Sequence, residues 1–152
     1  MSYIAREARQ ELLETVAEAA EEIGAALALV EAAYELLDEG SADRLEEQLF
    51  RPVQRAYGRA RRTHSGFAER HGFEARALSP RQPTHAAAQP RELVEDAADA
   101  AAEAEERLSE LQDSMRPVEV GDAELRDGLS EVRRLVGDVP VRARELTRVL
   151  GR

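Results

Sequence analysis

Arginine and histidine side chains recur at helical spacing between residues 55 and 71, and they are the groups in this chain best suited to binding a ligand. A guanidinium group offers a planar fork of donors that matches phosphate oxygens, and an imidazole adds a donor whose charge responds to pH. We therefore expect any anion-binding or small-ligand face to lie here. Its candidate residues are Arg55, Arg59, Arg62, His64 and His71.

The same residues also have a purely structural interpretation. The arginines can be neutralised by acidic side chains on a neighbouring helix, and exposed ion pairs of this kind contribute about 0–1 kcal/mol each. The histidines can be boundary residues with one buried ring edge and one hydrated nitrogen. We favour this interpretation, because 31 acidic residues are available to 21 basic ones.

Apart from two acidic pairs on the first helix, no other pattern in the chain predicts a catalytic, metal or cofactor site. There is no cysteine, which excludes thiolate nucleophiles, disulfides and cysteine-ligated zinc. Di-iron bundles carry Glu-x-x-His motifs, and this chain has none, since Glu69 is only two residues before His71. We therefore expect no cofactor and no metal. Whether the protein is an enzyme stays open, and a non-enzyme is favoured.

Two acidic pairs have the spacing found on metal-binding helices: Glu18 with Glu21, and Glu35 with Asp38. They resemble the Glu-x-x-Glu and Glu-x-x-Asp signatures of the all-α nucleotide pyrophosphohydrolases. That resemblance implies a magnesium-dependent enzyme as a remote alternative. Both pairs lie on one predicted helix, however, about 26 Å apart at 1.5 Å per residue, so they cannot share a metal ion.

Four amphipathic helices are expected to position these side chains. Apolar residues at alternating steps of three and four predict helices over about 2–39, 42–71, 90–115 and 122–150, with an irregular loop over 72–89. The clearest seam belongs to the first helix. It comprises Leu13, Val16, Ala20, Ile23, Leu27, Val30, Tyr34 and Leu37.

Helix ends are predicted from capping residues. Gly40 is expected to end the first helix, and Ser41 to cap the second. Gly72 is expected to stop the second helix, with Phe73 folding back onto its last turn. Pro90 suits the first position of the third helix. In the fourth helix Asp122 is the expected cap, and the seam continues through Pro140, which predicts one bent helix.

Charge alternates in blocks along the chain. Residues 1–50 carry 13 acids and three arginines, residues 51–91 two and nine, residues 92–131 fourteen and three, and residues 132–152 two and six. Because like-charged helices repel when they are neighbours, we expect the two acidic helices to lie on a diagonal. This predicts a single-domain, all-α four-helix bundle in up-down-up-down antiparallel order. The loop is also long enough to cross the bundle and make the second and third helices parallel, which is the alternative.

The long first helix is expected to overhang the bundle at its N-terminal end. Ile4 and Ala8 lie on the exposed stripe there, and the loop emerges beside it. We therefore predict that Phe73 and Leu78 pack near these two residues, within one chain or across a dimer.

Composition and charge narrow the function further. A net charge of −10 argues against nucleic-acid binding, which depends on neutralising phosphates. No apolar run is long enough for a membrane span, and no signal pattern precedes the first helix, so a cytoplasmic protein is expected. Its alanine and leucine seams favour a non-enzymatic interaction or scaffold protein that binds a protein partner or itself as a homo-oligomer. The alternative is a small-ligand or anion-binding bundle that uses the arginine and histidine face.

Overall fold

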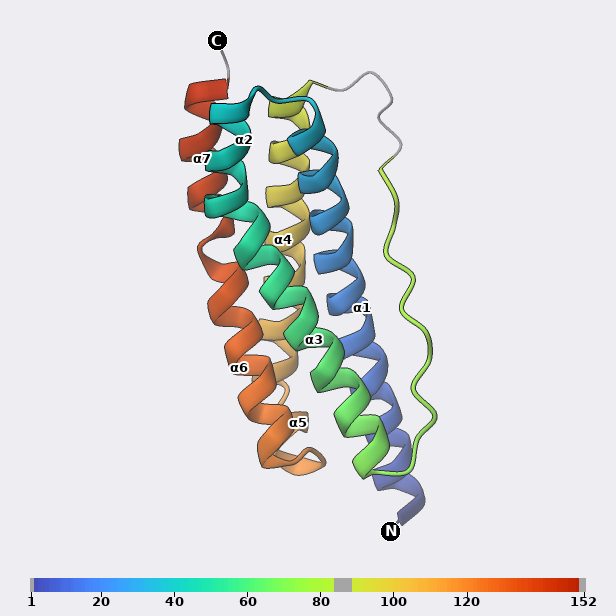
Figure 1. Ribbon diagram of the computed structural model, residues 1–152. Coiled ribbons are helices and arrows are strands. Elements are labelled where there is room, and N and C mark those ends of the chain that lie inside the picture. The colour runs from blue at the N-terminus through green and yellow to red at the C-terminus, as the bar shows by residue number, and fades with distance from the viewer. Residues whose placement is uncertain (1, 84–88, 151–152) are drawn as a thin grey trace.

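The computed structural model describes residues 2–83 and 89–150, and every regular element in these ranges is helical (Figure 1), which confirms the all-α class. The elements are α1 (Ser2–Glu35), α2 (Glu39–Leu45), the π-helical segment η1 (Glu46–Phe50), α3 (Arg51–Arg70), α4 (Pro90–Asp113), α5 (Arg116–Glu119), α6 (Ala123–Gly137) and α7 (Val139–Leu150). None of the described helices combines the length and the apolar character that crossing a membrane requires.

Several helix ends lie where the capping residues predict them. Gly72 adopts φ 73°, and the N–H of Phe73 donates to the carbonyl of Ala68 at 2.8 Å, which closes the last turn of α3. Pro90 is the first residue of α4. The carboxylate of Asp122 accepts the N–H of Leu125 at 2.8 Å and caps α6. These ends depend on residues a few positions apart, so local chemistry decides them.

The connection between α1 and α2 differs from the expected one. α1 ends at Glu35, because the side chain of Asp38 accepts the N–H of Ser41 at 2.8 Å and starts the next helix early. Asp38 is therefore the N-cap, and Gly40 lies inside α2 and does not terminate α1.

The two helix-interior prolines are accommodated differently. Pro52 follows the wider π-helical turn of η1, at the point where its missing N–H breaks the regular ladder. Pro140 is the second residue of α7, and the expected single bent helix is divided at Asp138 into α6 and α7. A proline in the first turn of a helix needs no N–H donor, so the break lies just before it.

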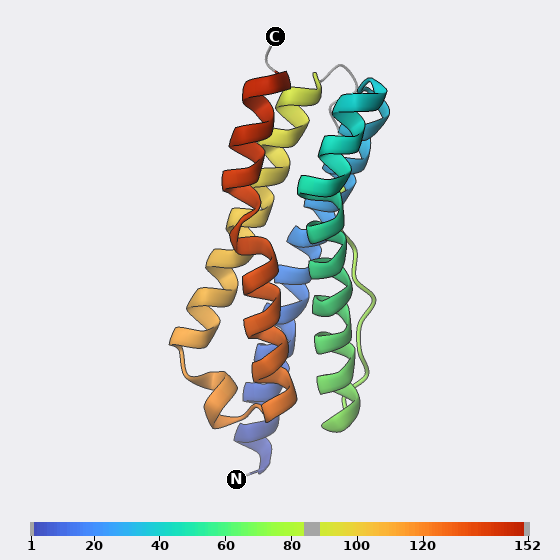
Figure 2. The same ribbon diagram turned by 60° about the vertical axis from the view of Figure 1, so that its left-hand side comes forward.

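The helices form columns that stand side by side: α1, the continuous α2–η1–α3 run, α4, and α6 followed by α7 (Figures 1 and 2). α1 and the α6–α7 column run in one direction, whereas α3 and α4 run in the other. The segment 73–83 is extended and runs back along α1 from the end of α3. The predicted up-down-up-down order is therefore wrong, and α3 and α4 are parallel.

The two acidic helices α1 and α4 are direct neighbours, and α1 makes its most extensive contact with α4. Both helices bury many alanines, which lets their backbones approach closely. The acids of α1 are neutralised from outside α3. Arg76 of the extended segment binds both Glu14 and Glu21 at 2.8 Å, and Arg107 of α4 lies 3.6 Å from Glu18. The acidic helices can be neighbours because these arginines offset the repulsion between their carboxylates.

One like-charged contact remains between the two helices. Burial raises the pKa of Glu22, and the nearby carboxylate of Glu103 raises it further, while Arg81 and Arg107 act in the opposite direction. The Oε2 atom of Glu22 is buried and has no hydrogen-bond partner among the described residues. The close packing of α1 against α4 therefore carries a local electrostatic cost.

The extended segment 73–83 lies against α1 and α3. The guanidinium of Arg6 lies 4.3 Å above the ring of Phe73, near the start of α1. Further along, the N–H of Ser79 donates to Glu21 at 2.8 Å. Leu78 precedes this anchor by one residue, far along α1 from Ile4 and Ala8, so its predicted position is wrong. Ile4 stays 72% exposed.

The buried face of α1 is wider than the predicted seam and coincides with it only in part. Val16, Ile23 and Val30 are buried as expected, but Leu27 is only half-buried and Tyr34 is exposed. The central stripe comprises Leu12, Val16, Ala19, Ile23, Ala26, Val30 and Ala33. Two neighbours, α3 and α4, cover α1 from different sides, so its buried face is wider than one heptad seam.

Candidate functional site

The five candidate residues of α3 do not form one site. Arg55 is exposed, and no ion pair or hydrogen bond joins its side chain to any described residue. The Nε of Arg59 donates to Glu131 of α6 at 3.1 Å. α3 therefore turns part of its arginine row toward α6 and not toward α1.

Arg62 and His64 lie together beside the extended segment, where both line a pocket with Arg76. His64 is buried, with 5% of its surface exposed. Burial lowers its pKa, and the positive charge of Arg76 lowers it further, against the opposing effect of Glu14 and Glu21. His64 is therefore a buried residue whose imidazole is neutral at pH 7.

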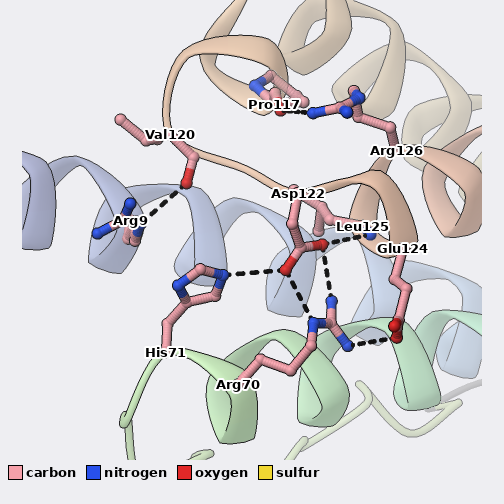
Figure 3. Close-up of polar contacts among 9 residues, drawn as sticks. All are labelled: Arg9, Arg70, His71, Pro117, Val120, Asp122, Glu124, Leu125 and Arg126. Carbon is pink, nitrogen blue, oxygen red and sulfur yellow. Dashed lines mark hydrogen bonds and ion pairs between the residues drawn. The ribbon is translucent and has the colours of Figure 1, made fainter.

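His71 belongs to a different cluster, which joins the end of α3 to the start of α6 (Figure 3). Asp122 is its centre. Arg70 donates to both Asp122 oxygens, from Nε at 2.8 Å and from Nη2 at 2.9 Å, and His71 donates from Nε2 at 2.9 Å. The remaining nitrogen of the Arg70 fork donates to Glu124 at 2.9 Å. The cluster uses the C-terminal residues of α3 to hold the capping residue of α6.

The charges of this cluster stabilise the contact between the end of α3 and the start of α6. Burial would raise the pKa of Asp122, but the hydrogen bonds from Arg70, the Leu125 N–H and His71 outweigh it and hold the pKa well below its usual range. An Asp–His pair activates a nucleophile only when a hydroxyl or thiol lies within reach of the imidazole. No hydroxyl of the described residues hydrogen-bonds to His71.

We expect Asp122→Ala to lower the free energy of unfolding by at least about 1–2 kcal/mol, because α6 loses its N-cap and Arg70 loses its main partner. The folded pKa of Asp122 is depressed, so its contribution is present above the unfolded pKa of about 4 and is lost as pH falls through the folded value. Urea unfolding measured from pH 7 to pH 2 should therefore show the unfolding free energies of the parent protein and of Asp122→Ala converging at low pH. Asp127→Ala, an exposed acid in the same helix, is the matched control and should stay close to the parent protein. Equal losses in the two variants would contradict the assignment.

A tightly held turn lies next to this cluster and leads through α5. It begins at Met115, which is the one non-glycine residue with positive φ (66°) in the described part of the chain. Pro117 is buried, and a Cβ atom at Gly121 would come within 2.3 Å of the Pro117 carbonyl oxygen. The turn can therefore close only with glycine at this position.

Three arginines fix this turn to the neighbouring helices. Arg9 of α1 donates to the carbonyl of Val120 at 2.9 Å, and Arg126 of α6 donates to the carbonyl of Pro117 at 3.2 Å (Figure 3). Arg116 pairs with Glu11 of α1. The backbone of the turn is thus restrained from two sides.

The turn displays apolar side chains at the end of the bundle where α1 begins. Met115 is 51% exposed and Val118 57%, and in the first turn of α1 Tyr3 is 76% exposed and Ile4 72%. We call the two residues of the turn, Met115 and Val118, the α5-end patch. Residues 116–121 were predicted only as the connection between two helices, although Pro117 and Gly121 mark a structured turn.

The acidic pairs that resemble pyrophosphohydrolase motifs are engaged in structural contacts. Glu18 pairs with Arg107, and Glu21 binds both Arg76 and the N–H of Ser79. Asp38 caps α2. No group of three or more histidine, aspartate or glutamate side chains within residues 2–83 and 89–150 is arranged to hold a metal ion.

No family model, no curated protein and no solved structure matches this chain. Its function must therefore be inferred from the contacts and exposed surfaces described above.

Proposed function

We propose that this protein is a non-enzymatic interaction protein that self-associates through the α5-end patch. The observation that carries the proposal is the exposure of Met115 and Val118 on a turn whose backbone is rigidly held. Large apolar side chains displayed on a fixed frame lose little conformational entropy when they are covered by a partner. Methionine in particular adapts its shape to an opposing surface.

The backbone of Met115 adds a second argument. A left-handed conformation costs a non-glycine residue about 1–2 kcal/mol, and such strain persists only where surrounding contacts impose it. Here the arginine contacts to Val120 and Pro117 hold the following turn in place. The left-handed backbone at Met115 thus lowers stability while its apolar side chain stays exposed. A binding surface accounts for this combination better than a simple connection does.

A second copy of the chain is the partner that we propose. A two-fold axis brings the same patch from two chains together, so one self-complementary surface suffices. The end also carries exposed groups of both signs, including Arg6 and Glu119, which can pair around an apolar centre. Magnesium-dependent hydrolysis remains the remote alternative, and nothing in the contacts of its acidic pairs favours it.

The double variant Met115→Ser/Val118→Ser should raise the dissociation constant of the oligomer at least about tenfold, because the interface loses two large apolar side chains. Light scattering and sedimentation over a range of concentrations measure this change. The melting temperature of the dilute protein should hardly move, since both side chains are exposed in the single chain.

The matched control is Val141→Ser/Val149→Ser, which removes two similarly exposed valines from α7. This control should associate like the parent protein. A parent protein that stays monomeric at every concentration would overturn the proposal. So would equal weakening by the two double variants.

A further inference from the structure

A pocket of 720 Å³ lies between α3 and the extended segment, away from the α5-end patch. Arg61, Arg62 and Ser65 of α3 line one side of it, and Ala77 and Leu78 of the segment line the other. Its volume lies in the range of small-molecule sites, about 300–1,000 Å³.

The charge of this pocket differs from that of the rest of the molecule. None of the described residues that line it is an aspartate or glutamate, although the chain has a net charge of −10. Each of the other pockets described in this structure is lined by at least three carboxylates. An anion in this one pocket would meet guanidinium groups without facing a carboxylate on the pocket wall.

The guanidinium groups at this pocket are free of carboxylate partners. Neither Arg61 nor Arg62 forms an ion pair with a described residue. Arg61 lies over the ring of Tyr57 at 5.6 Å, and Nη1 of Arg62 lies back over Gly58. By contrast, three other arginines of α3 are paired: Arg51, Arg59 and Arg70.

Further donors are available along the same walls. The hydroxyl of Ser65 has no hydrogen-bond partner among the described residues, and the backbone N–H groups of Ala77 and Leu78 have none there either. Guanidinium, hydroxyl and backbone N–H groups are the donors that bind phosphate oxygens in proteins.

Arg76 serves as an anchor of the pocket wall and not as a free cation. It donates to Glu14 at 2.8 Å and to Glu21 at 2.8 and 3.0 Å, so its charge is already compensated. Together with the bond from Ser79 to Glu21, these contacts hold the extended segment against the helices. The pocket is therefore formed before any ligand arrives, which lowers the cost of binding.

We infer that this pocket binds a small phosphate monoester, with its phosphate on Arg61, Arg62 and Ser65 and an aromatic or apolar body against Tyr57 and Leu78. The phosphate explains the free cationic donors, and the body explains the apolar wall formed by the segment. Of the α3 residues expected from sequence to bind anions, only Arg62 and His64 line this pocket. The inference does not depend on the proposed self-association, because it uses different residues.

Isothermal titration with phenyl phosphate tests the site at physiological ionic strength, with inorganic phosphate as the comparison. We expect submillimolar binding of phenyl phosphate (order of magnitude) and at least about tenfold weaker binding of inorganic phosphate, which lacks the body. Arg61→Gln/Arg62→Gln should weaken phenyl phosphate binding at least about tenfold without lowering the melting temperature, since neither arginine has a carboxylate partner to lose.

Arg55→Gln is the matched control, because Arg55 is exposed on the same helix but does not line the pocket. It should bind phenyl phosphate like the parent protein, and so should the Met115→Ser/Val118→Ser variant. Absence of binding, or equal weakening by Arg55→Gln, would overturn the site. Equal affinity for inorganic phosphate would overturn the monoester assignment. Tighter binding of RNA or polyphosphate than of phenyl phosphate would show that a polyanion surface, and not this pocket, recognises phosphate.

Discussion

Ile23→Asp is expected to unfold the protein at room temperature. Ile23 is fully buried in the middle of α1, the helix that contacts both α3 and α4. The variant buries an unpaired carboxylate there, and we expect a loss of more than about 4 kcal/mol, against a total stability of about 5–15 kcal/mol for ordinary domains. Circular dichroism and urea unfolding measure the loss.

Leu27→Asp provides the matched comparison one turn further along the same helix. Leu27 is only half-buried, so an aspartate there can reach water and should be tolerated much better. Arg55→Ala should cost less than about 1 kcal/mol, because the side chain is exposed and unpaired among the described residues. If Leu27→Asp destabilises the protein as much as Ile23→Asp, the faces of α1 are assigned wrongly.

Gly128→Ala is expected to destabilise the protein by about 1–3 kcal/mol, although the same change in an open helix position gains up to about 1 kcal/mol. A Cβ atom at residue 128 would lie 2.2 Å from Oγ1 of Thr63 and 2.8 Å from its Cγ2. Thr63 cannot move aside easily, because it is buried and its hydroxyl donates to the carbonyl of Arg59 at 2.8 Å. Thermal and urea unfolding give the change in stability.

A double-mutant cycle identifies the cause of this loss. Thr63→Ala removes both crowding atoms, so Gly128→Ala should cost at least about 1 kcal/mol less in that background. Gly58→Ala is the control, because a Cβ there meets only the flexible end of Arg62, at 3.3 Å, and the change should be neutral or stabilising. Additive effects of the Thr63 and Gly128 changes would contradict the close contact between α3 and α6.

Local patterns predicted the elements of this fold well. Gly72, Pro90 and Asp122 end or begin helices as expected, because their backbone preferences and side-chain hydrogen bonds act over only a few residues. The heptad spacing located α1 along the chain, but it misplaced Leu27 and Tyr34 relative to the core. A helix covered by two neighbours has a wide buried face, and spacing alone does not locate its centre.

The candidate site was predicted less well than the helices. His64 and His71 are seven residues apart on one helix, yet His64 lies under the extended segment and His71 binds Asp122 of α6. The spacing places both on one face of the helix. The spacing gives no information on their neighbours in space. Arg76, beside His64, lies 12 residues further along the chain, and Asp122, bound to His71, lies 51 residues further along.

The amino-acid sequence by itself determined the all-α class, the approximate helices and the alternation of acidic and basic blocks. Only the tertiary structure decided the order of the helices and the surfaces that remain free. Arg76 and Arg81 were counted with the basic block of α3, but they lie on the extended segment and reach Glu14, Glu21 and Glu22 of α1. These pairs offset repulsion between the acids of α1 and α4, and neither Arg61 nor Arg62 pairs with a carboxylate of the described residues. Charge along a chain sets which groups attract, whereas the path of the backbone sets which of them can meet.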